Sequence, residues 1–465
     1  MVIATKPAQS CGTLLRDARK RRGWSQPRLA IELRRIAGRH GRTLPADSSV
    51  KRRIASWENG HSAPEEFYGP LLCEAFGLTA AALGLKHLTG QDAALLDTSY
   101  PASPDTAIAG VDRLWRADLN GYEPLLEAGP SEHAWSEASL RWLVAPEASF
   151  PSARGPEAPR VGLGDVTVVK STSDMFAQLD DRFGGEHARQ SVIQYLSQDV
   201  APLLKGTYTE SVGRALFSTV AECTLLAGWM SYDACHHGLA QRYFLQALRF
   251  AQDGNDRRLA GSILSAMSHQ ATFVGEFVHA ATLARAALMG ISGVATPTLR
   301  AQFHAMEARA LARTGDRRGC EAALAQAAKH LESRNSDDEP EWITYFDEAE
   351  LAAEAAHCFR DVRSARQAVA YAENAMSGSH VRSDFFATMV LADAHLHAKD
   401  PEEACRVALD ALDLGEQLRS ARCVAYLAEF RGHLDSVGDC AAVRDFHEQV
   451  ADHRLWAATE KRMRR

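Results

Sequence analysis

Long apolar segments are missing from this chain. No stretch of about 18 or more uninterrupted apolar residues occurs, and a membrane-spanning helix needs about 20. The first residues, MVIATKPAQS, contain no apolar run of the length found in secretory signal peptides. We therefore expect neither a transmembrane helix nor a leader, no membrane partner, and a cytoplasmic location.

Closely spaced cysteines are missing too. The nine cysteines stand singly, and no two have the CxxC spacing that zinc and redox sites use. Cys235-His236-His237 and the Asp393, His395 and His397 group are the nearest approach to a metal site. Residues one or two positions apart do not share a helix face, so neither group converges on one ion without a bend. We expect reduced, mostly buried thiols and neither a metal nor a cofactor.

Catalytic signatures are equally scarce. Gly162-Leu163-Gly164-Asp165 lacks the third glycine and the strand–helix setting of a dinucleotide-binding fingerprint. The phosphate loop GxxxxGK[ST], the GxSxG elbow and the HExxH pair do not occur. We expect a protein that is not an enzyme.

What the chain does have is a strongly uneven distribution of charge. Residues 1–60 hold 14 lysines and arginines against 4 aspartates and glutamates, a net charge of +10, so the remainder carries −17 within a total of −7. A nucleic-acid backbone is the obvious partner for such a basic segment, because each neutralised phosphate releases counterions. A solvated basic face is the alternative that charge alone leaves open.

Helical periodicity dominates the first 87 residues. Gly23 is suited to ending a first helix, Ser25 to capping a second, and Asp47-Ser48-Ser49 to capping a third. A basic loop, Gly38–Ala46, is expected between the second and third helices. The expected helices are Cys11–Arg22, Pro27–Ile36, Val50–Glu58, Glu65–Phe76 and Thr79–Leu85.

Two pieces of this region resemble the helix-turn-helix family of phage-repressor type, also called the xenobiotic-response-element family. One is Gly23-Trp24-Ser25-Gln26, which opens the second helix. The other is Ile54–Gly60 (IASWENG), followed by Pro64 and then Leu71–Leu78. The resemblance covers about residues 11–85 and implies sequence-specific DNA binding. The family joins these two helices by a tight turn, whereas here the basic segment Ala37–Ala46 intervenes, which leaves the tilt of the third helix open.

The third helix has the two faces that a DNA-reading helix needs. Val50, Ile54 and Trp57 share one face and are expected in the core. Lys51 and Arg52 point elsewhere, and such side chains are the commonest readers of guanine edges. Phosphate contacts by Gln26 follow from the family resemblance. The candidate DNA-binding residues are Gln26, Arg28, Arg42, Ser49, Lys51, Arg52, Arg53 and Ser56.

Turn-like residue pairs recur in the Ala-rich half of the chain, at intervals of 40, 45, 39 and 39 residues. They are Gly275-Glu276, Gly315-Asp316, Arg360-Asp361, Lys399-Asp400 and Gly438-Asp439. A fixed period of paired helices is typical of an α-solenoid. Gly-Asp turns followed by Ala-rich helices resemble the tetratricopeptide repeat family over about residues 230–460, although the period is nearer 40 than the 34 of that family.

A third resemblance concerns the middle of the chain. Residues 174–189 (DMFAQLDDRFGGEHAR) and 225–248 (LLAGWMSYDACHHGLAQRYFLQAL) resemble actinobacterial regulators that join a repressor-type helix-turn-helix to a repeat domain and control development or specialised metabolism. We expect an all-α fold in three parts. These are a helix-turn-helix domain at 11–87, a connecting region with a Pro- and Gly-rich linker at 88–164, and a helical-repeat sensor or dimerisation domain at 165–460.

The sequence therefore predicts a DNA-binding transcriptional regulator. One short recognition helix reads few base pairs, so we expect a homodimer on double-stranded DNA. The repeats are expected to bind a peptide, small-molecule or protein effector, or to self-associate. Candidate groove residues are Tyr243, His304, Tyr345 and Asp347. The alternative is a scaffold or signalling adaptor that does not bind DNA, for which the arginines around the third helix would have no use.

Overall fold

The computed structural model describes residues 11–39, 43–64, 67–78, 83–85, 95–144, 158–378, 380–438 and 440–463. Over these ranges the chain is helical, and its only β-type pairing is an isolated bridge between Arg160 and Thr207. The expected all-α class is confirmed. Residues 166–170 (VTVVK), whose residue types are common in strands, lie inside a helix, where Val166 and Val169 share the buried side and Val168 is exposed.

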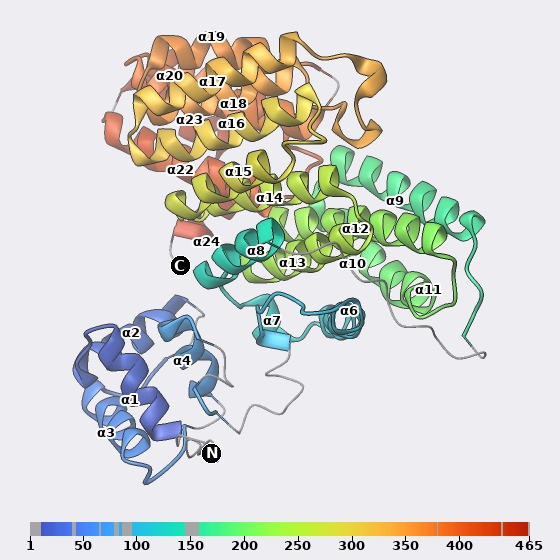
Figure 1. Ribbon diagram of the computed structural model, residues 1–465. Helices are drawn as coiled ribbons and strands as arrows, with labels where there is room; N and C mark the ends of the chain where they lie inside the picture. Colours follow the sequence, from blue (N-terminus) through green and yellow to red (C-terminus); the bar gives the residue numbers. More distant parts are fainter. Residues whose placement is uncertain are drawn as a thin grey trace.

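The amino-terminal unit contains a compact group of helices with a hydrophobic core of its own. They are α1 (Cys11–Arg21), α2 (Gln26–Arg39), α3 (Asp47–Glu58) and α4 (Tyr68–Phe76). Leu33, Val50, Ile54 and Leu72 are at most 1% exposed and belong to one cluster that includes no residue beyond Leu85. Figure 1 shows this unit beside the larger body of the protein.

The segment between α2 and α3 is shorter than expected. The helix α2 continues through Gly38 to Arg39, because Ala37 is fully buried and extends its apolar face. The helix α3 begins at Asp47 rather than Val50, and Ala46 precedes it without a side-chain cap, so the predicted cap at Asp47–Ser49 is wrong. The expected fifth helix falls largely on residues 79–82, outside the described residues.

The described residues of the larger unit form a long series of helices. They are α6 (Pro104–Leu119), α7 (Glu123–Leu126), α8 (Glu132–Val144), α9 (Leu163–Phe183), α10 (Gly185–Tyr195), the π-turn η1 (Leu196–Val200), α11 (Ala201–Leu204), α12 (Glu210–Asp233), α13 (His237–Asp253), α14 (Arg257–Phe273), α15 (Phe277–Gly290), α16 (Pro297–Thr314), α17 (Arg317–Glu332), the short 3-10 turns η2 (Ser336–Asp338) and η3 (Glu341–Ile343), α18 (Glu348–Asp361), α19 (Ala365–Ala375), α20 (Val381–His397), α21 (Pro401–Leu414), α22 (Ala421–Val437), α23 (Ala441–Val450) and α24 (Arg454–Met463).

Many consecutive helices of this unit pack against each other, and several of these pairs are joined by a tight turn of one design. A left-handed residue ends one helix and an aspartate caps the next, as at Asn255-Asp256, Gly315-Asp316 and Lys399-Asp400. The predicted breaks at Gly315 and Lys399 are confirmed. The break predicted at Arg360-Asp361 is wrong: both residues belong to α18, and the left-handed residue is Arg363.

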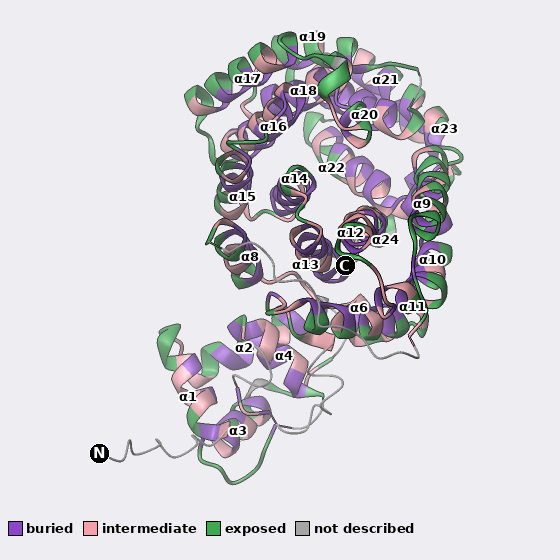
Figure 2. Ribbon diagram, turned by 45° about the vertical axis from the view of Figure 1, so that its right-hand side comes forward, coloured by how far each residue is buried: buried purple, intermediate pink, exposed green. Residues whose placement is uncertain are grey.

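Helices near the end of the chain pack against helices near the start of the larger unit. In Figure 2 an outer row that includes α15, α17, α19 and α21 runs around an inner row. Helix α20 packs against α9, and α22 packs against α12. Backbone hydrogen bonds seal the junction, from Arg419 N–H to the carbonyl of Phe183 (2.7 Å) and from Glu186 N–H to the carbonyl of Arg419 (3.2 Å).

The region 88–164, expected to be a connecting region because of its prolines, contributes helices to the core of the larger unit. Trp115 of α6 and Trp135 and Trp142 of α8 are at most 1% exposed and belong to the same hydrophobic cluster as α12 to α16. The packing is close enough that a Cβ on Gly290 of α15 would lie 1.8 Å from the Trp142 ring. The proposed boundary at residue 164 therefore does not separate two cores.

Two further expectations concern membranes and thiols. None of the helices in the described ranges is both long and apolar enough to cross a bilayer. All nine cysteines are free, and five of them are buried. This agrees with the expected reduced thiols.

Candidate nucleic-acid interface

Glu58 at the end of α3 is the residue that fixes α1, α2 and α3 relative to one another. Its carboxylate accepts hydrogen bonds from the Arg19 guanidinium on α1 (2.6 and 2.8 Å) and from the Gln26 amide at the start of α2 (2.9 Å). Arg16 adds a hydrogen bond to the Glu58 carbonyl (2.8 Å). Burial would raise the pKa of the Glu58 carboxyl, but these hydrogen bonds outweigh burial and hold the pKa below its ordinary value.

Close backbone approach completes the arrangement. A Cβ on Gly12 would lie 2.4 Å from the carbonyl oxygen of Trp57, so no larger residue fits where α1 crosses α3. At the start of α2, the Ser25 hydroxyl accepts a hydrogen bond from Arg28 N–H (3.3 Å), as its predicted capping role requires. The three helices thus form a rigid support, and α3 is held along one side.

The buried and exposed faces of α3 follow the predicted pattern. Val50, Ile54 and Trp57 are 0%, 1% and 3% exposed. Lys51 and Arg52 are exposed on the remaining surface. This surface is open to a ligand, because only the opposite side of the helix packs in the core.

Most arginines of the unit are engaged in the fold. Arg19 is bound to Glu58, Arg22 donates to the carbonyl of Phe76 (2.9 Å), and Arg34 donates to the carbonyl of Pro45 (2.5 Å). Arg35 pairs with Glu32 (2.5 Å). The Arg53 guanidinium lies 5.5 Å from the centre of the Tyr68 ring. A large part of the positive charge seen in the sequence therefore has a structural use.

Three exposed cationic side chains of α2 and α3 are not used in this way. Arg28 and Lys51 form no hydrogen bond or ion pair through their side chains with the described residues. Arg52 makes only long contacts within its own helix, to the carbonyl of Ser48 (3.4 Å) and the hydroxyl of Ser49 (3.5 Å). Positive groups without an internal counter-charge are suited to bind an external anion such as phosphate.

The other predicted DNA-binding residues have different surroundings. Gln26 is half-buried and donates to Glu58, so its amide supports the fold. The Ser56 hydroxyl is 2.7 Å from that of Ser62. Arg53 is half-buried and Ser49 is half-buried near Arg52. Arg42 lies outside the described residues.

The predicted groove residues do not come together. Tyr243 is fully buried, and its hydroxyl donates to Asp118 (2.6 Å), whose carboxylate also pairs with Arg189 (2.7 Å). Asp347 caps α18 by accepting from the N–H groups of Ala349 and Glu350. The groove assignment is wrong for both, because one is a core residue and the other a helix cap.

The remaining two groove candidates are partly exposed. The ring of His304 stacks on that of His330, with 5.6 Å between ring centres. Tyr345 is 50% exposed, and its hydroxyl accepts from the Gln302 amide (2.6 Å). Each has a local partner, and neither lines the cavity between α10 and α24 that is described below.

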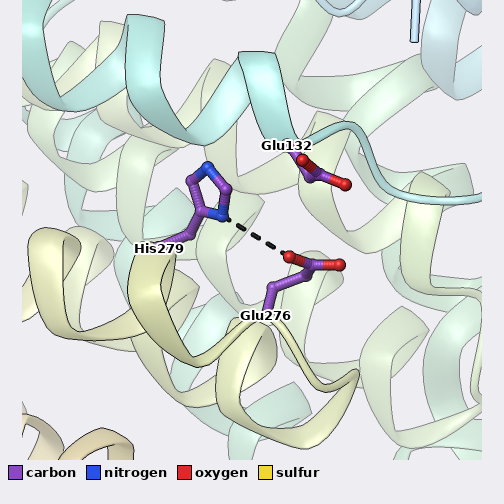
Figure 3. Close-up of side chains that lie close together, drawn as sticks. All are labelled: Glu132, Glu276 and His279. Carbon is purple, nitrogen blue, oxygen red and sulfur yellow. Dashed lines mark ion pairs between the residues drawn. The ribbon is translucent and has the colours of Figure 1, made fainter. Parts of the chain in front are cut away.

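A group of possible metal ligands, which the sequence analysis did not select, lies at the start of α8 and α15. Ligand atoms of Glu132, Glu276 and His279 are within 4.8 Å of one another, and His279 Nδ1 is 3.5 Å from a Glu276 oxygen (Figure 3). Glu132 is exposed and the other two are half-buried. Two helix N-termini point their positive ends toward this group, which disfavours a cation. We therefore assign no metal here.

Comparison of the chain with protein-family models, with curated proteins and with solved structures gives no match.

Proposed function

We propose that the protein is a transcriptional regulator that binds double-stranded DNA in a sequence-specific manner. In this proposal α2 and α3 act as a repressor-type helix-turn-helix, and α3 enters the major groove. The observation that carries it is the exposure of Lys51 and Arg52 on α3, without strong internal partners, on a unit whose other arginines are mostly engaged.

The exposed cations have separate proposed roles. Lys51 and Arg52 are on the exposed face of α3 and reach base edges, where guanine offers two acceptors to a long cationic side chain. Arg28 at the start of α2 contacts phosphate and positions the protein without reading sequence. The Glu58 hydrogen bonds support these roles, since they hold the start of α2 against the end of α3.

The larger unit is proposed to control this binding. We regard its paired helices as a tetratricopeptide-like solenoid that senses an effector or self-associates, in a cytoplasmic regulator of development or specialised metabolism. A homodimer is proposed because a single recognition helix contacts few base pairs. Sedimentation of the full chain at micromolar concentration should give a dimer, and a monomer alone would contradict this part of the proposal.

The proposal is tested by selecting binding sites for the full chain from a pool of random duplexes. We expect a recurrent sequence, and an affinity whose logarithm falls linearly with the logarithm of salt concentration, by about 0.9 per phosphate contacted. A matched duplex with the recurrent sequence scrambled is the control and should bind more weakly.

No enrichment of any sequence, together with no binding of duplex DNA at low salt, would contradict the proposal. That outcome would leave the scaffold or adaptor function, in which the helices of the larger unit bind a protein. If the protein binds the selected duplex and its scrambled form with equal affinity, the binding is a general attraction to phosphate. That result would contradict sequence-specific reading.

A further inference from the structure

The place where the last helices meet the first ones contains a partly open cavity of ≈ 1150 Å³. Phe183 and His187 line it from α9 and α10, Arg419 from the segment before α22, and Leu455, Ala458 and Arg462 from α24. Pockets for small molecules usually enclose about 300–1,000 Å³. The cavity is thus large enough for a ligand with more than one ring.

Contacts within the protein hold the walls of this cavity in place, so the cavity is formed before any ligand binds. Gly184 has a φ of +85°, and a Cβ there would lie 2.7 Å from the carbonyl oxygen of Arg419, so the two segments touch through their backbones. Asp233, which is 1% exposed, accepts hydrogen bonds from Gly185 N–H (2.9 Å) and from the Ser420 hydroxyl (2.8 Å). Such a pre-formed site loses little conformational freedom on binding.

The segment before α22 is fixed from the other side as well. The Arg454 guanidinium donates to the backbone carbonyls of Glu416 (3.0 Å) and Leu418 (2.9 Å). Arg454 is therefore part of the wall, and its donors are used by backbone carbonyls of the segment between α21 and α22. The cations that remain for a ligand are those of Arg419 and Arg462.

Both of these guanidinium groups have spare donors. The Arg419 side chain forms no hydrogen bond or ion pair within the described residues, and Arg462 has one long contact, 3.7 Å to the sulfur of Cys235. Two acidic residues, Glu186 and Glu416, also line the cavity. Neither forms a side-chain ion pair with Arg419 or Arg462 in the part of the chain that the structure describes. Burial raises the pKa of the Glu186 carboxyl and outweighs the charge of Arg419, which acts to lower that pKa.

The rest of the lining is apolar or aromatic. The rings of Phe183 and His187 have their centres 4.8 Å apart and form one surface, and Leu455 and Ala458 of α24 lie on the cavity wall as well. Leu455 is 1% exposed and belongs to the core of the last helices, so it provides a firm apolar floor. Cations beside an apolar surface are suited to a ligand with an acidic group on a ring-sized body.

We propose that this cavity binds a small organic anion, a molecule with an apolar ring system and a carboxylate, sulfonate or phosphate group. The acidic group binds Arg419 and Arg462, and the ring system lies on Phe183, His187 and Leu455. The site joins α10, the segment before α22 and α24, so a bound anion ties the end of the chain to the start of the ring. This ligand site does not depend on whether the amino-terminal unit binds DNA.

The experiment uses the full chain and the fluorescent probe anilinonaphthalene sulfonate, an aromatic anion. We expect saturable binding of one probe molecule, with affinity reduced about tenfold or more in Arg419→Gln and in Arg462→Gln, because each removes a charge-assisted hydrogen bond. Ala458→Trp, which fills part of the cavity, should also reduce binding. Arg318→Gln is the matched control, since Arg318 is exposed on α17, away from the cavity lining, and should leave binding unchanged.

A neutral probe of similar shape, phenylnaphthylamine, separates charge from apolar contact. We expect it to bind at least about tenfold more weakly than the sulfonate, and its affinity should not change in Arg462→Gln. Equal binding of both probes, or equal affinity of the sulfonate for Arg419→Gln, Arg462→Gln and Arg318→Gln, would overturn the proposal. If Ala458→Trp fails to fold, the two glutamine variants decide alone, because both arginines are exposed.

Discussion

Replacing Glu58 with glutamine is the most informative change to the amino-terminal unit. The side chains of Glu58 and Arg19 are 3% and 12% exposed, and Arg19 has two hydrogen bonds to this carboxylate. Removing one partner of a buried ion pair costs about 3–5 kcal/mol. Glutamine retains one acceptor and Arg19 retains some contact with water, so we expect a loss of about 2–3 kcal/mol.

Hydrogen exchange measured by mass spectrometry on the full chain is the suitable assay, because it reports the opening of each segment separately. Amides of α1, α2 and α3 in Glu58→Gln should exchange about 30- to 150-fold faster than in the parent chain. Asp17→Asn, which removes a half-exposed carboxylate of α1 that has no side-chain partner among the described residues, is the control and should have little effect. Unchanged exchange in Glu58→Gln, or an equal increase throughout α6 to α24, would refute the role given to Glu58.

The pH dependence has a definite sign. The pKa of the Glu58 carboxyl is lower in the folded chain than its ordinary value of 4.5. Its contribution to stability is therefore full above that value and is lost as the pH falls through the lowered pKa. The difference between the parent chain and Glu58→Gln should shrink on acidification.

The remaining predictions concern packing, a buried hydroxyl and buried histidines. Gly12→Ala should destabilise α1 to α3 in hydrogen exchange, since its Cβ would lie 2.4 Å from a backbone oxygen, whereas Gly38→Ala, with no atom within 4 Å, should be neutral or stabilise α2 by about 0.5–1 kcal/mol. In thermal unfolding, Tyr243→Phe should lower the stability of the larger unit by about 1–1.5 kcal/mol, because Asp118 loses a donor, and an unchanged melting temperature would contradict this. Burial lowers the pKa of His269 and His357 well below 6.5, so the folded chain binds fewer protons than the unfolded chain, and the melting temperature should fall as the pH drops below that value; a flat profile would contradict their neutral burial.

The features of the fold that depend on residues close together in the chain could be predicted from the sequence. The periodic spacing of Val50, Ile54 and Trp57 placed them in the core, and the Gly315-Asp316 and Lys399-Asp400 turns were located from residue type. The end of α2 was misplaced because Ala37 and Gly38 look like a helix terminus, while the buried contact of Ala37 that extends the helix comes from the tertiary fold.

The parts that could not be predicted depend on residues far apart in the chain. The structural role of Glu58 could not be predicted, because its partner Arg19 is on another helix and no local spacing pairs the two residues. The groove prediction for Tyr243 fails because its hydroxyl donates to Asp118 in the core, where the same carboxylate accepts from Arg189. The cavity beside Arg419 arises only when the last helices meet α9 and α10, which no local spacing specifies.

The central claim is that the exposed face of α3 reads DNA, and the most direct measurement compares variants of the full chain on a selected duplex and on its scrambled control. Arg52→Ala should lose about 1–3 kcal/mol of preference for the selected sequence. Arg28→Ala should weaken binding to both duplexes alike and reduce the salt slope by about one phosphate contact. Equal effects of the two variants on both duplexes, or no effect of either, would contradict the assignment of α3 as the reading helix.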